Sequence, residues 1–242
     1  MKKIITQTPE ELGELAAAHA AEQIKTAIKE NGSCRLLLAT AASQLETLAS
    51  LQKKDIDWSK VEVFHLDEYI GLPESHGASF VKLLKERFLA GIGPVKAAHF
   101  IDGTASPEEA ITKVSAEIVR APVDVALVGI GENAHIAFND PPADFETKEA
   151  YRVVTLDDAC RRQQHGEGWF PSFEDVPKTA ISMTVYQIMQ SKVIISVVPH
   201  KQKAKAVFDT LNNDLTSNIP ATMLCTHPNW TLYLDIHSAS LL

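Results

Sequence analysis

The stretch that decides the fold class is Val123-Asp124-Val125-Ala126-Leu127-Val128-Gly129. Its apolar residues follow one another instead of alternating with polar ones, which is typical of a strand buried on both faces of a parallel sheet. Similar short apolar runs occur elsewhere in the chain, at Cys34–Ala39, Val61–Leu66, Val193–Pro199 and Thr231–Asp235. We therefore predict a sheet whose strands are mostly parallel.

Helical patterns separate these apolar runs. Thr8-Pro9-Glu10-Glu11 and Ser106-Pro107-Glu108-Glu109 each combine an N-cap residue, proline at the first helical position and glutamate two residues later. The helix after Thr8 is expected to end at Asn31-Gly32, and further helices are expected at Phe80–Phe88 and Lys201–Leu211. Strands that alternate with helices indicate βαβ units. The prediction is a three-layer αβα sandwich with a Rossmann-like sheet, forming a single domain over residues 1–242 because no linker divides the chain.

Composition narrows the functional classes. The chain has 242 residues, 45% of them hydrophobic, and a net charge of −8, which is ordinary for a globular protein. No run of Lys or Arg exceeds two residues, so no nucleic-acid partner is expected. Three widely spaced cysteines without a CxxC pair suggest neither zinc nor disulfides, and no stretch of 18 apolar residues suggests a membrane span. These features are typical of a cytoplasmic protein with no membrane partner.

Polar residues cluster where the predicted strands end. The clusters are Ala39–Ser43, Asp67–Tyr69, Gly129–Asp140 and Pro199–Lys203. In open parallel sheets, ligands bind at the carboxyl ends of strands, at the point where the strand order reverses. We expect these four clusters to form one site.

Two of the clusters are suited to an anion. Small residues from Thr40 to Ser43 let backbone N–H groups approach a phosphate at a helix N-terminus, where Ser43 is expected to be the N-cap. The alternative is an ordinary capped helix start. Lys203 could hold a phosphate as a point charge, or it could be a surface lysine of the following helix.

The other two clusters carry groups for acid–base chemistry. Asp67 and Glu68 are adjacent at a strand end, so only one of them can easily face a pocket, where it could act as a base; otherwise both are solvated loop acids. His135 lies among Asn133, Asn139 and Asp140, which can fix its orientation for catalysis, although a lone histidine is more often structural. No HxxxH spacing occurs, so no metal site is expected.

The sequence resembles the glucosamine-6-phosphate deaminase family. The motifs that carry the resemblance are Leu66-Asp67-Glu68-Tyr69-Ile70-Gly71-Leu72-Pro73, Gly129-Ile130-Gly131-Glu132-Asn133-Ala134-His135-Ile136-Ala137-Phe138-Asn139-Asp140-Pro141, Gln202-Lys203-Ala204 and Ile219-Pro220-Ala221. They occur in the same order as in the family and span almost the whole chain.

The resemblance implies a cofactor-free and metal-free conversion of glucosamine 6-phosphate to fructose 6-phosphate and ammonia. The implied catalytic residues are Asp67, the base that moves a proton between C2 and C1, His135, which opens the ring, Asn133 and Asp140, which hold that histidine, and Glu68. The implied phosphate-binding residues are Thr40, Ala41, Ala42, Ser43 and Lys203. The partner is a small sugar phosphate, and since the family contains monomers and hexamers, a homo-oligomer also fits.

Several positions depart from the family pattern. Alanine stands where glycine is usual at Ala41, Ala42 and Ala134, Asn133 replaces aspartate, and Asp140 replaces glutamate. An alanine with positive φ would be strained by ~1 kcal/mol or more. The arginine expected before Val176 is absent, and Arg161 or Arg162 is the candidate replacement. The stretch Asp140–Phe173 is the candidate lid over the site.

Two other functions fit the same fold. A 6-phosphogluconolactonase is a hydrolase of similar fold, but Ala137-Phe138-Asn139-Asp140-Pro141 resembles the deaminase pattern more closely. A sugar-phosphate sensor without turnover is favoured by the glycine-to-alanine changes and opposed by the retained acids and His135.

Overall fold

The computed structural model describes all 242 residues, and its main feature is a seven-stranded parallel sheet. The strand order is β1 (Lys2–Thr6), β10 (Trp230–Asp235), β9 (Val193–Val198), β6 (Val125–Leu127), β2 (Cys34–Leu38), β3 (Val61–His65) and β5 (Ala97–His99). All neighbouring pairs run parallel. The five strands expected from apolar runs are confirmed, and β1 and β5 were not predicted.

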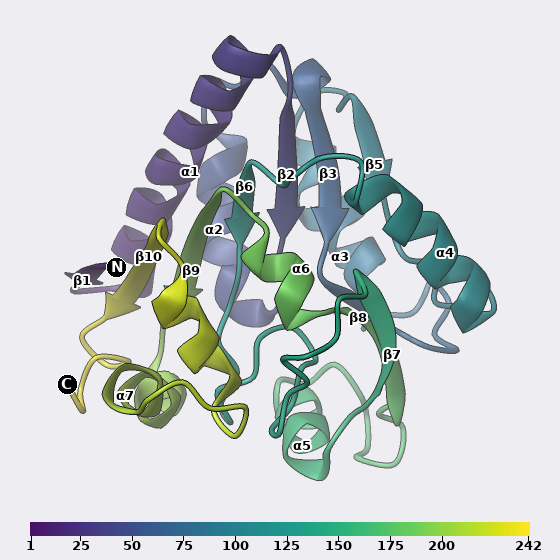
Figure 1. The fold of residues 1–242 in the computed structure, drawn as a ribbon, viewed down its shortest axis with the longest axis vertical. Coiled ribbons are helices and arrows are strands. Elements are labelled where there is room, and N and C mark those ends of the chain that lie inside the picture. Colours follow the sequence, from purple (N-terminus) through teal and green to yellow (C-terminus); the bar gives the residue numbers. More distant parts are fainter.

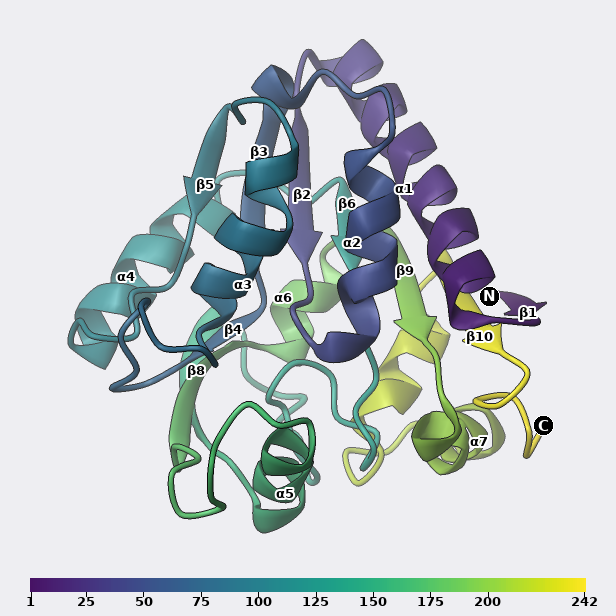
Figure 2. The ribbon, with the colours of Figure 1, turned by 180° about the vertical axis from the view of Figure 1, so that it is seen from behind.

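Helices cover both faces of this sheet (Figures 1 and 2). The helices on one face are α1 (Pro9–Asn31), α2 (Leu45–Gln52) and α3 (Phe80–Arg87); those on the other include α4 (Pro107–Ile118), α6 (Val185–Met189) and α7 (Ala204–Asn212). In β2, Leu36 and Leu38 join the core beneath α1, whereas Leu37 joins the core beneath α4. Because successive side chains of a strand point to opposite faces, one apolar run supplies both cores. The three-layer αβα prediction is confirmed.

The helix starts show which local signals were sufficient. Thr8 accepts a hydrogen bond from the Glu11 N–H at 3.2 Å, and α1 ends at Gly32, whose φ is 77°. Ser106 caps α4 in the same way. The expected cap at Ser43 is wrong: a short 3-10 turn, Ala42–Gln44, precedes α2, and neither segment has a side-chain cap. The serine hydroxyl instead accepts a hydrogen bond from Gln44 at 3.1 Å.

A second, smaller sheet was not predicted. It is antiparallel, in the order β4 (Asp67–Tyr69), β8 (Thr179–Met183) and β7 (Tyr151–Thr155). Together with α5 (Asp158–Gly166), it lies below the main sheet in Figure 1. Strand β4 follows directly on β3, so this sheet holds Asp67 at the carboxyl end of the main sheet.

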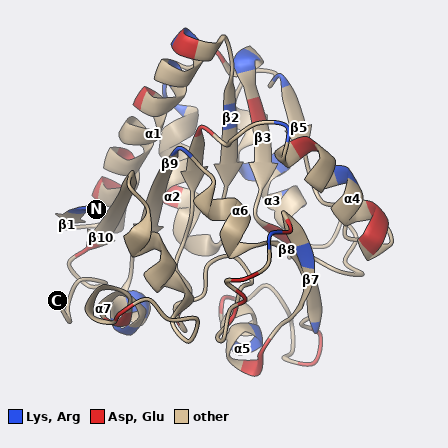
Figure 3. Cartoon of the chain, viewed as in Figure 1, with Lys and Arg blue, Asp and Glu red and all other residues tan.

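The chain reverses direction across the sheet between β2 and β6. Strands β3 and β5 extend to one side of β2, and the chain then returns to place β6, β9 and β10 on the other side. The chain segments that follow β2 and β6 therefore leave the sheet in opposite directions. Open parallel sheets bind ligands at such a point. Lysine and arginine are scattered among acidic residues over the elements in view, so attraction of an anion is a local property (Figure 3). None of the helices has the length and apolar character to cross a membrane.

Candidate active site

A cleft lies at the reversal between β2 and β6. It brings together residues from all four predicted polar clusters. The predicted site residues that line it are Thr40, Ala41, Ser43, Asp67, His135 and Lys203. The predicted residues Ala42, Glu68, Asn133 and Asp140 do not line it. The fold thus brings four separate strand ends together into one site.

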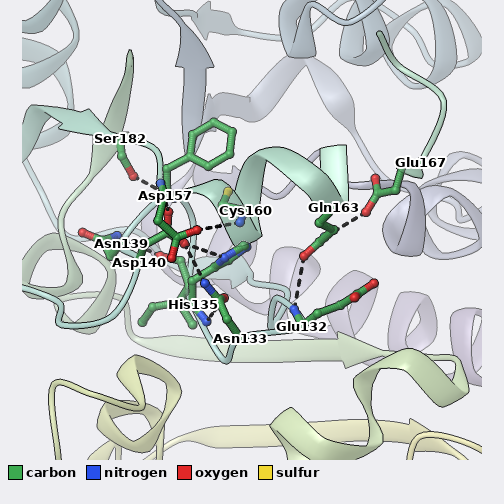
Figure 4. A network of polar contacts seen from close by, with 12 residues as sticks. Glu132, Asn133, His135, Asn139, Asp140, Asp157, Cys160, Gln163, Glu167 and Ser182 are labelled. Atoms are coloured by element: carbon green, nitrogen blue, oxygen red, sulfur yellow. Dashed lines mark hydrogen bonds and ion pairs between the residues drawn. The ribbon is translucent and has the colours of Figure 1, made fainter. Parts of the chain in front are cut away.

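His135 is held by a buried carboxylate. Its Nδ1 lies 2.9 Å from Asp140 Oδ1 (Figure 4). Gly131 leaves room for the ring, because a Cβ atom at that glycine would lie 2.2 Å from His135 Nε2. With Nδ1 engaged behind it, Nε2 is the ring nitrogen left for acid–base exchange at the cleft.

Asn133 holds both His135 and Asp140 in place. Its Nδ2 donates to Asp140 Oδ1 at 3.1 Å, and its Oδ1 accepts from the His135 N–H at 3.1 Å. Burial alone would raise the pKa of Asp140, but the hydrogen bonds from His135, Asn133 and the Asp157 N–H hold it below its ordinary value. Asp140 therefore stays ionised beside the imidazole.

The backbone around His135 is strained. Ala134 has a φ of 64° and Ala137 a φ of 50°, in the left-handed region that costs an alanine ~1–2 kcal/mol. The expected strain at Ala134 is therefore present. Ala41, by contrast, has a φ of −64°, and Ala42 is not among the residues with positive φ. Alanine in the loop after β2 carries no such cost.

Asp67 enters the cleft as a buried carboxylate without a protein partner. Its side chain makes no hydrogen bond, and the residue is 7% exposed. Burial, with a smaller contribution from the charge of Glu68, raises the pKa of Asp67 to about 8. Such a carboxyl group exchanges its proton near neutral pH, as a general base must.

Glu68 points away from the cleft. Its carboxylate accepts hydrogen bonds from the Ser79 hydroxyl at 2.8 Å and from the Val81 and Tyr69 N–H groups at 3.0 Å. Burial raises its pKa despite these bonds. The inclusion of Glu68 among the catalytic residues does not fit this position, because successive residues of β4 face opposite sides. Glu68 fixes the start of α3 instead.

Lys203 is the one cationic side chain that lines the cleft. It is 7% exposed and forms neither a hydrogen bond nor an ion pair. Burial lowers its pKa, while the charges of Glu167 and Glu132 oppose that shift. Thr40, which also lines the cleft, has a hydroxyl group without a protein partner. An unpaired buried ammonium and an unpaired hydroxyl in one cleft are suited to an anionic ligand group.

Helix α5 supplies two cleft residues that the sequence did not reveal. Gln163 and Gln164 both line the cleft. Neither candidate arginine does: Arg161 is buried against the Phe173 and Val176 carbonyls, and Arg162 is exposed. The Asp157 N-cap was a detectable signal for this helix, but its inward face could not be assigned from so short a segment.

One group of potential metal ligands exists in the chain. Ligand atoms of His135, Asp140 and Cys160 all lie within 4.8 Å of one another. The His135 and Asp140 atoms are already bonded to each other, and burial raises the pKa of the Cys160 thiol. These residues are thus arranged as a hydrogen-bonded pair with a neutral thiol beside it.

Proteins of known family are similar to this chain along most of its length. Residues 7–233 match the family described as glucosamine-6-phosphate isomerases/6-phosphogluconolactonase. The chain is 38% identical to a glucosamine-6-phosphate deaminase of Thermoanaerobacter pseudethanolicus, covering 100% of this chain and 95% of the relative, and 35% identical to one of Bacillus cereus, covering 100% and 89%.

Two solved structures are similar to this chain over its whole length. The structure of a monomeric glucosamine-6-phosphate deaminase matches with a TM-score of 0.91 at 30% identity over 100% of both chains. A 6-phosphogluconolactonase of Trypanosoma brucei matches with a TM-score of 0.80 at 18% identity, covering 100% of this chain and 98% of that one, which shows the fold alone. The chain belongs to the glucosamine-6-phosphate isomerase/6-phosphogluconolactonase family.

Proposed function

We propose that this protein is a glucosamine-6-phosphate deaminase that converts glucosamine 6-phosphate to fructose 6-phosphate and ammonia. The observation that carries the proposal is one cleft lined by an unpaired buried carboxylate, an oriented imidazole and an unpaired buried ammonium: Asp67, His135 and Lys203. Full-length relatives that bear this name support it. The free state of all three cysteines favours a cytoplasmic setting.

The chemistry follows from the positions of these groups. Lys203 and Thr40 hold the phosphate, far from the reacting carbons, and so fix the sugar in the cleft. His135 exchanges a proton with the ring oxygen and opens the ring, while Asp140 and Asn133 keep the imidazole in place. The substrate is then an open-chain aldehyde with an amino group on C2.

Proton transfer and loss of ammonia follow. Asp67 removes the proton from C2 while the C1 aldehyde oxygen takes up a proton from solvent, which gives an enolamine; Asp67 then returns its proton to C1, which gives a protonated imine at C2. Water adds to that imine and ammonia leaves, so the product is the 2-ketose. A carboxyl group with a pKa of about 8 is matched to both halves of the transfer, since it must accept and then give the same proton.

The test is a substrate panel with purified protein. Glucosamine 6-phosphate should yield equal amounts of ammonia and fructose 6-phosphate without added nucleotide or metal. Formation of acid from 6-phosphogluconolactone, with no ammonia from the amino sugar, would establish the lactonase activity instead. Saturable binding of glucosamine 6-phosphate without turnover would establish a sensor.

A further inference from the structure

Gln164 is a nearly buried residue with an unused hydrogen-bonding group in the cleft. It is 5% exposed and lines the cleft, on the inward side of α5. Its amide nitrogen Nε2 has no hydrogen-bond partner in the protein. Buried polar groups are normally paired, so an unpaired donor that lines a cleft indicates a ligand.

The amide has a fixed orientation. Tyr69 donates its phenolic hydrogen to Gln164 Oε1 at 2.9 Å, so the Nε2 hydrogens remain for the ligand. Burial raises the pKa of Tyr69 above its ordinary value, so the phenol stays protonated and remains a donor. The ring centroids of Phe80, Phe138 and Phe170 lie 5.1, 5.3 and 5.4 Å from that of Tyr69. These rings prevent the tyrosine from turning away.

The neighbouring glutamine shows that the free amide is specific to position 164. Gln163 Oε1 accepts from the Glu132 N–H at 3.2 Å, and its Nε2 donates to Glu167 at 2.8 Å (Figure 4). Both ends of Gln163 are therefore used within the protein. Only one end of Gln164 is used.

Tyr69, which anchors this donor, lies on the strand that carries Asp67. Tyr69 stands two residues after Asp67 on β4, and Phe80 and Phe138, which pack on it, also line the cleft. Lys203 follows β9, which is separated from β3 in the main sheet by β6 and β2, and β4 follows β3 in the chain. The Gln164 amide is thus anchored by a residue of the strand that carries Asp67, the proposed base.

We infer that Gln164 is a substrate-binding residue whose Nε2 donates a hydrogen bond to an oxygen on the carbon chain of the sugar phosphate. The inference rests on the proposed function for the identity of that substrate. The amide is neutral and accepts nothing through Nε2, so it recognises a hydroxyl or carbonyl oxygen. It contributes to the choice of sugar, whereas Lys203 contributes to the choice of phosphate.

The test compares Gln164→Leu with the wild-type enzyme. Loss of one neutral hydrogen bond, with the substrate oxygen left unpaired, should raise the KM for glucosamine 6-phosphate about tenfold and change kcat much less. Tyr69→Phe retains the amide but removes its anchor, so its KM should rise by a smaller factor. Arg162→Ala changes an exposed residue of the same helix and is the matched control, with KM expected within about twofold of wild type.

Competitive inhibition by inorganic phosphate tests whether Gln164 contacts the phosphate group or the carbon chain of the substrate. The inhibition constant of phosphate should be the same for Gln164→Leu and wild type, because the inferred hydrogen bond is to the carbon chain and not to the phosphate. A tenfold rise in the inhibition constant of phosphate for Gln164→Leu would overturn the inference, because the amide would then bind the phosphate group. A Gln164→Leu enzyme with wild-type KM but a lower melting temperature would also overturn it, as a structural role. The wild-type protein is assayed first, because a lack of turnover there would reject the proposed function and not the role of Gln164.

Discussion

Replacement of Asp67 by asparagine should abolish turnover and make the protein more stable at alkaline pH. The two effects have one origin, which is the burial of this carboxyl group in the cleft. The folded protein binds the Asp67 proton more tightly than the unfolded chain does. Ionisation of Asp67 therefore destabilises the fold, and this loss grows from the ordinary pKa of 3.8 up to the folded pKa of about 8.

The magnitude follows from the difference between these two pKa values. Four units correspond to roughly 6 kcal/mol at pH above 8, an upper value that applies if the surroundings do not relax. Asparagine has nearly the same shape as protonated aspartate and does not ionise. The stability advantage of Asp67→Asn over wild type should therefore be small below pH 4 and should grow by about 4 kcal/mol between pH 5 and pH 9.

Urea denaturation at pH 5, 7 and 9 measures this difference, and Asp214→Asn, which alters an exposed carboxylate, is the control. The same variant should lose exchange of the C2 proton with deuterated solvent. In the wild type, kcat/KM should rise with pH, with its midpoint at the folded pKa of about 8, and level off above it. The reasoning is refuted if the advantage of Asp67→Asn is constant across this range, since the pKa of Asp67 would then be ordinary.

Three further predictions test the rest of the cleft. Ala134→Gly should raise the free energy of unfolding by ~1 kcal/mol because φ is 64° there, whereas Ala41→Gly, at a φ of −64°, should not raise it. Denaturation of both variants measures the two free energies, and a destabilised Ala134→Gly variant would contradict the strain at Ala134. Lys203→Met should raise the KM for glucosamine 6-phosphate about 10- to 100-fold through loss of a charged hydrogen bond, and an unchanged KM would move phosphate binding elsewhere. Asp140→Asn should lower kcat about 100-fold because the imidazole loses its ionised partner, and wild-type kcat would show that His135 does not need it.

The main sheet could be predicted because its signals are local. Short continuous apolar runs such as Val123–Gly129 favour a strand covered on both faces, and Thr8 with Gly32 determines both ends of α1. The small sheet lacked such a signal. Its strand β4 is three residues long and begins with two acids, so only pairing with β8 makes it a strand. Pairing between distant segments is not encoded in either segment alone.

The site was predictable in its residue types and less so in its geometry. The strand ends indicated Asp67, His135 and Lys203, because the ends of parallel strands meet at one edge of the sheet. Which of Asp67 and Glu68 faces the cleft depends on the register of β4, which the sequence leaves open. Gln164 could not be found at all, since its role depends on a hydrogen bond to Tyr69, 95 residues away in the chain.

The departures around His135 are coupled to one another. Asn133 donates to Asp140 through Nδ2 and accepts from the His135 backbone through Oδ1. An aspartate at 133 could accept that backbone N–H, but it could not donate to Asp140 and would place a second negative charge beside it. The amide therefore lets the shorter carboxylate remain ionised next to the imidazole, as its lowered pKa indicates. The hydrogen bonds of Asn133 thus keep His135 and Asp140 paired although the backbone at Ala134 is strained, so the acid–base pair that turnover requires is in place.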